Sequence, residues 1–172
     1  MSRRIEAPPE VIFAVLADPG RHLEIDGSEM LRGPASDGMI TGVGDVFVMR
    51  MHYSPIGDYD MNNHVVEYEQ DRRIGWEPEA GDSYPGVESQ SAAERRWGHR
   101  WSYELTPDGP GATIVTESYD CSRAPEEERA NMDNGRVWRQ SMAETLERLE
   151  RACTGQPASA AAESGAGEPA AS

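Results

Sequence analysis

The segment from Arg96 to Leu105 concentrates side chains that could do chemistry. Read with a period of two, one of its faces carries Trp97, His99, Trp101, Tyr103 and Leu105. Such alternation predicts a β-strand with one buried and one solvent-exposed face. Buried indole and phenol groups need hydrogen-bond partners, so this face suits the wall of a ligand cavity. The alternative is ordinary core packing.

Three residues are candidates for acid–base chemistry. His99 titrates near neutral pH when its environment is ordinary, and it lies on the aromatic face. Tyr103 could donate a hydrogen bond to a developing enolate or carbonyl oxygen, and Glu117 could act as a base if it faces inward. The alternative for His99 is a structural histidine held by hydrogen bonds. We therefore take His99, Tyr103 and Glu117 as the candidate catalytic residues.

Composition excludes several function classes. The net charge of −15 argues against nucleic acid and against anionic membrane surfaces as partners. All 16 basic residues are arginines, so Schiff-base catalysis, a pyridoxal-phosphate anchor and a Walker lysine are excluded. No apolar run is long enough to span a bilayer and none near the start resembles a signal peptide, so we expect a cytoplasmic protein.

Common cofactor motifs are also missing from the sequence. Gly42-Val43-Gly44 lacks the third glycine of a dinucleotide fingerprint, and the pair His22 and Asp26 is too small for a metal site. We expect neither a metal nor a cofactor. A long helix between Cys121 and Cys153 would hold them roughly 40 Å apart, whereas a disulfide needs Cα atoms within about 7 Å. We therefore expect reduced thiols.

Hydrophobic periodicity and turn residues predict an antiparallel sheet with helices at both ends of the chain. The expected strands are residues 2–7 at an edge, 29–32, 39–41, 45–53, 59–68, 73–78, 96–105 and 112–120. The expected helices are residues 10–17, 21–25 and one long helix from Pro125 to about residue 152. Residues 79–94 have no period and predict a long loop.

The strand faces and the first half of the long helix supply candidate ligand-binding residues. The inward faces are rich in methionine, aromatic and amide side chains, and the start of the helix is polar and small. That half of the helix either covers a cavity or is simply exposed, and the methionines line a ligand or pack a core. The candidates are Met49, Met51, Tyr53, Asn63, Trp76, Trp97, Trp101, Tyr119, Asn131, Gly135 and Trp138.

The order of elements resembles the START-like superfamily, also called SRPBCC or Bet v 1-like. The residues that carry the resemblance are Ile5–Val11, Phe13–Pro19, Asn63–Glu69, Arg72–Pro78 and Thr113–Asp120. The chain most resembles actinobacterial members often labelled polyketide cyclase/dehydrase. The resemblance implies an α+β helix-grip fold, with a curved antiparallel sheet around a long C-terminal helix. It covers a domain of residues 1–153, and residues 154–172 read as a disordered tail.

The resemblance also implies a cavity between the sheet and the long helix. We expect this cavity to bind a hydrophobic or aromatic, polyketide-like small molecule. Two functions stay open. One is a cofactor-independent cyclase or dehydratase of the aromatase/cyclase type, which requires at least two polar groups converging deep in the cavity. The other is a non-catalytic carrier or sensor, whose cavity would be polar only at its rim. A purely regulatory interaction domain is a third alternative.

Overall fold

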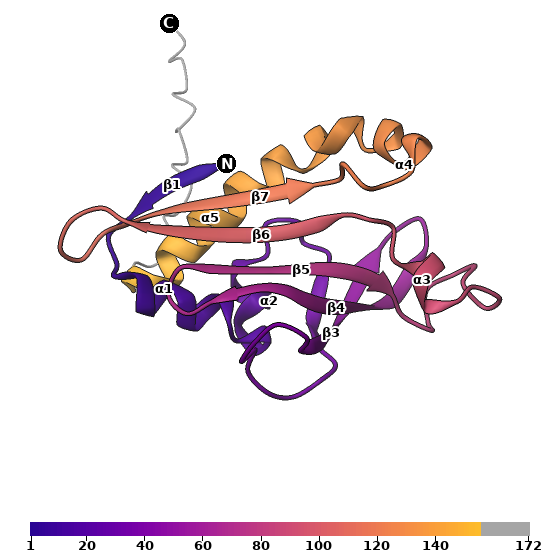
Figure 1. Ribbon diagram of the computed structural model, residues 1–172, viewed down its shortest axis with the longest axis horizontal. Coiled ribbons are helices and arrows are strands. Elements are labelled where there is room, and N and C mark those ends of the chain that lie inside the picture. The colour runs from indigo at the N-terminus through magenta and orange to yellow at the C-terminus, as the bar shows by residue number, and fades with distance from the viewer. Residues whose placement is uncertain (156–172) are drawn as a thin grey trace, which may run out of the picture.

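Seven strands form a single antiparallel sheet in the computed structural model, which describes residues 1–155. Their order across the sheet is β1-β7-β6-β5-β4-β3-β2, so β1 and β2 are the edge strands. The strands are β1 Ser2–Ile5, β2 Leu31–Pro34, β3 Val46–Tyr53, β4 Gly57–Glu69, β5 Arg73–Ala80, β6 Arg100–Pro107 and β7 Thr113–Asp120. Figure 1 shows β4 to β7 running side by side across the molecule.

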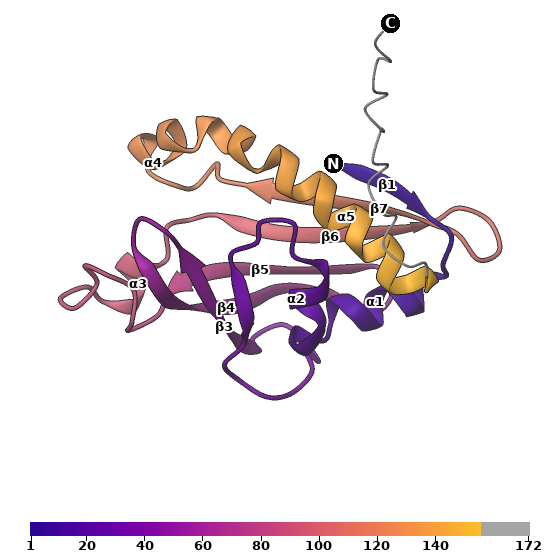
Figure 2. The same cartoon turned by 180° about the vertical axis from the view of Figure 1, so that it is seen from behind.

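The helices are α1 Pro9–Leu16, η1 Pro19–Arg21, α2 His22–Ile25, α3 Ala92–Arg95, α4 Glu126–Asn131, η2 Asp133–Trp138 and α5 Arg139–Thr154. The helices α1, α2 and α5 lie on one face of this sheet, whereas α3 lies at the end of β5 in the connection to β6 (Figure 1). Figure 2 shows α5 crossing the sheet, with α1 near its C-terminal end. The predicted α+β helix-grip architecture is confirmed, because α5 lies along a curved antiparallel sheet.

The core fills one end of the space between sheet and helices. The second half of α5 contributes Leu146 and Leu149, which pack with Ile12 and Leu16 of α1 and with Ile74 of β5. All five side chains are fully buried or nearly so. The other end of the space, beside α4 and η2, is lined by larger and more polar side chains, and there a cavity opens.

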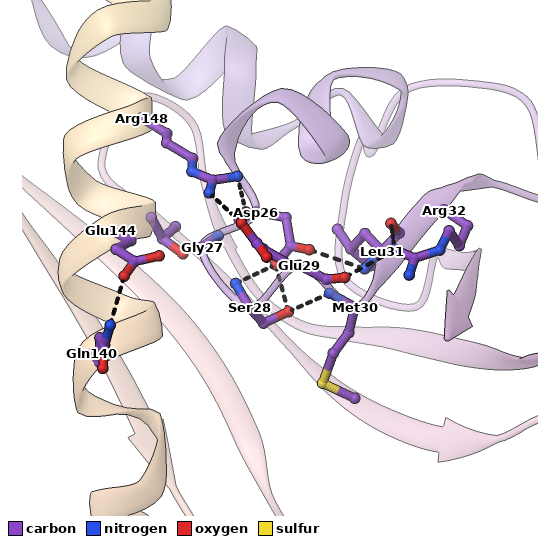
Figure 3. Close-up of polar contacts among 11 residues, drawn as sticks. Asp26, Gly27, Ser28, Glu29, Met30, Leu31, Arg32, Gln140, Glu144 and Arg148 are labelled. Carbon is purple, nitrogen blue, oxygen red and sulfur yellow. Dashed lines mark hydrogen bonds and ion pairs between the residues drawn. The ribbon is translucent and has the colours of Figure 1, made fainter. Parts of the chain in front are cut away.

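The turn that follows α2 fixes α5 against the sheet (Figure 3). The amide of Gly27 donates a hydrogen bond to Thr145 Oγ1 at 3.1 Å, and Arg148 Nη1 donates one to the Asp26 carbonyl at 2.6 Å. A Cβ atom on Gly27 would lie 2.2 Å from the carbonyl oxygen of Ser141. Only glycine therefore permits this close approach of the turn to α5.

The single long helix predicted from Pro125 is wrong. Asp133, Asn134 and Gly135 have φ values of 46°, 51° and 86°, and three left-handed residues cannot continue a right-handed helix. The helical region is therefore divided into α4, η2 and α5. Asp, Asn and Gly are the residues that tolerate this conformation best, so the interruption has a local cause in the sequence.

The aromatic strand begins later than predicted, at Arg100 rather than Arg96. Gly98 has a φ of 79°, and its Cα lies so close to Arg123 that an added Cβ would meet the Arg123 carbonyl oxygen at 2.5 Å. A left-handed residue ends the pleat. Trp97 and His99 therefore stand on an irregular segment ahead of β6.

Three other predicted boundaries differ. Residues 39–41 form no strand, and the Ile40 amide instead donates a hydrogen bond to the Ala17 carbonyl. The predicted loop 79–94 includes the end of β5 and the start of α3, whose first turn is capped by Ser91 and Glu94. Thr154, assigned to the tail, is the last residue of α5, and the rest of the predicted disordered tail, residues 156–172, lies outside the described residues.

Two further observations concern the described residues as a whole. Cys121 is buried and Cys153 is half-buried, and both are free thiols. Within residues 1–155, no helix combines the length and the apolar character needed to cross a membrane.

Candidate functional site

A cavity of about 690 Å³ lies between the sheet and the segment formed by α4, η2 and the start of α5. Its walls contain every predicted site residue except Gly135. These are Met49, Met51, Tyr53, Asn63, Trp76, Trp97, His99, Trp101, Tyr103, Glu117, Tyr119, Asn131 and Trp138. A volume of this size suits a small organic molecule of several rings.

Glu117 on β7 is the most unusual side chain of the cavity. It is 2% exposed, and Tyr103 Oη on the neighbouring strand β6 donates a hydrogen bond to its Oε1 at 2.8 Å. Its other oxygen, Oε2, is buried and has no hydrogen-bond partner among the described residues. Burial raises the pKa of Glu117 to about 7, although the Tyr103 hydroxyl opposes the shift. The carboxyl can therefore take up or release a proton near neutral pH.

His99 belongs to a second polar group in the cavity. Its Nδ1 lies 2.9 Å from the hydroxyl of Tyr119, which is also 2.9 Å from Met132 Sδ. A hydroxyl has one proton, and an imidazole nitrogen accepts it better than a thioether does. We therefore infer that the Tyr119 hydroxyl donates its hydrogen bond to His99 Nδ1. The proton of the neutral imidazole then lies on Nε2, which is a buried N–H donor without a partner among the described residues.

Burial lowers the pKa of His99 to about 4, while the Glu77 carboxylate acts weakly in the opposite direction. His99 is then neutral at pH 7, so it serves as a hydrogen-bond donor rather than as a proton shuttle. The sequence suggested His99 as the leading acid–base group, because an ordinary histidine titrates near neutrality. In the folded protein, Glu117 is the cavity group whose pKa lies near 7.

Trp138 closes the cavity from the end of η2. Its buried indole Nε1 makes no hydrogen bond of ordinary geometry with the described residues, but its N–H interacts with the Tyr119 hydroxyl and opposes the rise in the pKa of that group. The Trp138 ring lies 5.6 Å from that of Trp101. Gly135 does not line the cavity but supports it from behind, since an added Cβ would lie 2.8 Å from the Tyr119 ring. The left-handed residues before Trp138 thus bring the helical segment down onto Tyr119.

Asn63 faces the cavity as predicted but is partly satisfied by the backbone. Its Nδ2 donates hydrogen bonds to the carbonyls of Met61, at 3.3 Å, and Phe47, at 3.5 Å. Its side-chain oxygen is therefore the group left to meet a ligand. His22, which sequence reasoning considered only as a metal ligand, stacks on Trp76 at 5.5 Å, and burial lowers its pKa.

Sequence reasoning missed several other lining residues. They include Met30, Met61, Tyr59, Tyr84 and Glu128. In their segments the direction of the side chains was ambiguous, or the segment was interpreted as a loop or an exposed helix. For Tyr59 the signal was present, because it shares the odd-numbered face of β4 with Met61 and Asn63. For Tyr84 no periodic signal existed, since it lies between β5 and α3.

Comparison with known proteins places the chain in a family. A model described as "Polyketide cyclase / dehydrase and lipid transport" matches residues 1–154. The uncharacterized protein Rv0088 of Mycobacterium tuberculosis is 31% identical over 126 residues, which are 72% of this chain and 48% of that protein. The chain therefore spans about half the length of this curated relative.

Solved structures share the fold at low sequence identity. A solution structure of a protein from Arthrobacter aurescens has a TM-score of 0.65 and 15% identity, and covers 97% of this chain and 91% of its own. Truncated norcoclaurine synthase from Thalictrum flavum has a TM-score of 0.57 and 13% identity, with coverages of 91% and 92%. These likenesses concern the fold alone. Because the family model spans nearly all described residues, the chain belongs to the polyketide cyclase/dehydrase and lipid transport family.

Proposed function

We propose that this protein binds an aromatic or otherwise hydrophobic, polyketide-like molecule in the cavity and catalyses its cyclisation or dehydration without a cofactor. The observation that carries the proposal is the buried carboxyl of Glu117, with one oxygen bonded to Tyr103 and the other free inside the cavity. A structural glutamate in a core would have partners for both oxygens. A pKa of about 7 equips it for proton transfer.

The chemistry follows from proton transfer to and from this carboxyl. As a carboxylate, Glu117 takes a proton from the carbon next to a ketone, and the electron pair of that C–H bond forms an enolate. In dehydration, the C–O bond at the next carbon then breaks, and the Glu117 proton joins the departing hydroxide to give water and a conjugated ketone. In cyclisation, the enolate carbon instead attacks a second carbonyl, whose oxygen receives the proton.

Neutral donors in the same cavity support the enolate oxygen. The Nε2–H of His99 is buried and unpartnered among the described residues, and the Nε1–H of Trp138 is buried beside the Tyr119 hydroxyl. Donors fixed before the reaction stabilise a developing oxyanion without reorganisation, and their effect increases when water is excluded. An enzyme requires such polar groups to converge deep in its cavity, and Glu117, which is 2% exposed and lines the cavity, supports the proposal most directly.

A carrier is the second candidate, and the methionine content favours it. Six of the eight methionines line the cavity, at positions 30, 49, 51, 61, 132 and 142. Methionine adapts its shape to different apolar partners, as suits a wall that accepts a range of molecules. A carrier requires this lining but does not require Glu117 to titrate near neutrality.

An aromatic β-hydroxyketone, 4-hydroxy-4-(2-naphthyl)butan-2-one, tests the two candidates. Its dehydration gives a conjugated enone that is followed by ultraviolet absorbance, and calorimetry measures its binding separately. We expect the protein to accelerate dehydration, and Glu117→Gln to lose about 10²- to 10⁴-fold in rate while still binding. Glu104→Gln, an exposed glutamate on β6, is the matched control. Binding without acceleration would refute catalysis and leave the carrier.

A further inference from the structure

The cavity is lined by acidic side chains but by no arginine. Asp26, Glu117 and Glu128 line it, whereas none of the 16 arginines, all of which lie in the described residues, is among its lining residues. In a chain with this many guanidinium groups, their complete exclusion leaves no cationic partner for an anionic ligand. A carboxylate, phosphate or sulfate entering the cavity would lose water without an opposing charge to replace it.

Aromatic rings are correspondingly concentrated there. All four tryptophans line the cavity, as do all tyrosines except Tyr68. Indole and phenol rings carry negative charge on their faces, which attracts a cation that approaches within about 6 Å of the ring centre. The walls are therefore electrostatically negative in two ways, through carboxylates and through ring faces.

Three of these rings, those of Tyr59, Tyr84 and Trp97, form a contiguous aromatic cluster. Tyr59 and Tyr84 lie 5.1 Å apart with an interplanar angle of 79°, and Tyr84 and Trp97 lie 5.0 Å apart at 68°. At these separations and angles the rings pack edge to face, so a charged group can meet only the outer faces of the cluster and not a space between its rings. Burial raises the pKa of Tyr59 to about 12, which keeps this phenol neutral.

Glu128 of α4 adds an acidic side chain to the same wall of the cavity. Burial raises the pKa of Tyr84 above its ordinary value, and the nearby carboxylate of Glu128 raises it further. Glu128 is exposed and lines the cavity, so its carboxylate stands at the border between the cavity and solvent. A cation held by the rings would thus have a carboxylate next to it.

We propose that the cavity selects ligands that carry a substituted ammonium group on an aromatic body, with the ammonium on the outer faces of Tyr84 and Trp97 and within reach of the charge of Glu128. The inference rests on the proposed binding of a small molecule, and it adds the sign of that molecule's charge. The rest of the ligand extends toward Glu117, His99 and Trp138. Fatty acids and other anions are disfavoured as ligands, because no guanidinium group lines the cavity.

Three probes with one aromatic body test this selectivity by calorimetry. They are (2-naphthylmethyl)trimethylammonium, the neutral 2-naphthalenemethanol and the anion 2-naphthylacetate. We expect the Kd of the ammonium to be at least tenfold lower than that of the alcohol, with the acetate weakest. An alcohol that binds as tightly as the ammonium would overturn the charge preference alone, since the cavity would still bind aromatic molecules. If no probe binds, the proposed function fails as well.

Variants locate the ammonium within the cavity. Tyr84→Leu keeps apolar volume but removes a ring face. The Kd of the alcohol divided by the Kd of the ammonium should therefore fall at least threefold, mainly through weaker ammonium binding. At low ionic strength, Glu128→Gln should lower the ratio about threefold, as expected for one exposed charge pair. Glu127→Gln changes the same charge on an exposed neighbour that does not line the cavity, and should leave the ratio unchanged. A preference that survives both cavity variants would refute this placement of the ammonium.

Discussion

Replacing Glu117 by glutamine should make the folded protein more stable at alkaline pH. In the unfolded chain the carboxyl has its ordinary pKa of 4.5, whereas in the folded protein burial raises the pKa to about 7. Below pH 4.5 the group is neutral in both states and costs nothing. As the pH rises from 4.5 to 7 the unfolded state releases its proton first, so the folded state loses relative stability.

The size of the effect follows from the difference in pKa. At about 1.4 kcal/mol per pKa unit, the shift corresponds to roughly 3 kcal/mol at pH 8, to order of magnitude. Because Glu117 is 2% exposed, solvent screens this penalty little. Glutamine has nearly the same shape, carries no charge and can still accept the hydrogen bond from Tyr103.

Urea unfolding at a series of pH values from 4 to 9 measures the prediction. The free energy of unfolding of Glu117→Gln minus that of the wild type should be constant below pH 4.5. It should rise between pH 4.5 and 7 and then level off. Glu104→Gln, exposed on β6, should show no such rise near neutrality. A difference that stays flat with pH, or that falls, would show that the carboxyl is not buried in the way described.

Two further predictions concern other parts of the molecule. Burial lowers the pKa of His99 to about 4, so its nitrogen resonances should not shift between pH 5.5 and 8 in heteronuclear NMR, and a midpoint near 6.5 would contradict this. Gly27→Ala places a methyl group against the backbone of α5, and should lower the free energy of unfolding by about 1–3 kcal/mol. In the control Gly42→Ala the added methyl group meets nothing within 4 Å, so the free energy of unfolding measured in urea should change by less than roughly 1 kcal/mol. Equal losses in the two variants would refute the role of the close approach between Gly27 and α5.

The sequence predicts which side chains face the cavity better than it predicts where the strands begin, for a physical reason. Side-chain facing in β3 and β7 follows from a period of two, which burial on one face enforces, so the sequence predicts that Met49 faces inward and offers Glu117 as a base on the condition that it does. The start of β6 depends instead on Gly98 against Arg123, a contact between segments distant in sequence that no local pattern reveals.

The chemistry of the site could likewise be predicted only in part. Residue types suggested that His99, Tyr103 and Glu117 could share a site, and they do lie in one cavity. Which of them titrates near neutrality depends on burial and on hydrogen-bond partners, and neither can be read from residue type. The orientation of Glu117 beside Tyr103 comes from the register of β6 and β7, in which these two residues are paired.

The interruption at residues 133–135 has a consequence for how fast the cavity exchanges its contents. Neither α4 nor η2 contains a buried residue, whereas α5 contributes Met142, Leu146 and Leu149 to the interior. Local unfolding of residues 126–138 therefore separates Trp138 and Met132 from the cavity wall but exposes no fully buried side chain of its own, and it leaves the anchored half of the helix in place. The amide hydrogens of α4 should then exchange with solvent through a local opening, far faster than those of α5, and the residence time of a ligand would be governed by that opening rather than by global unfolding.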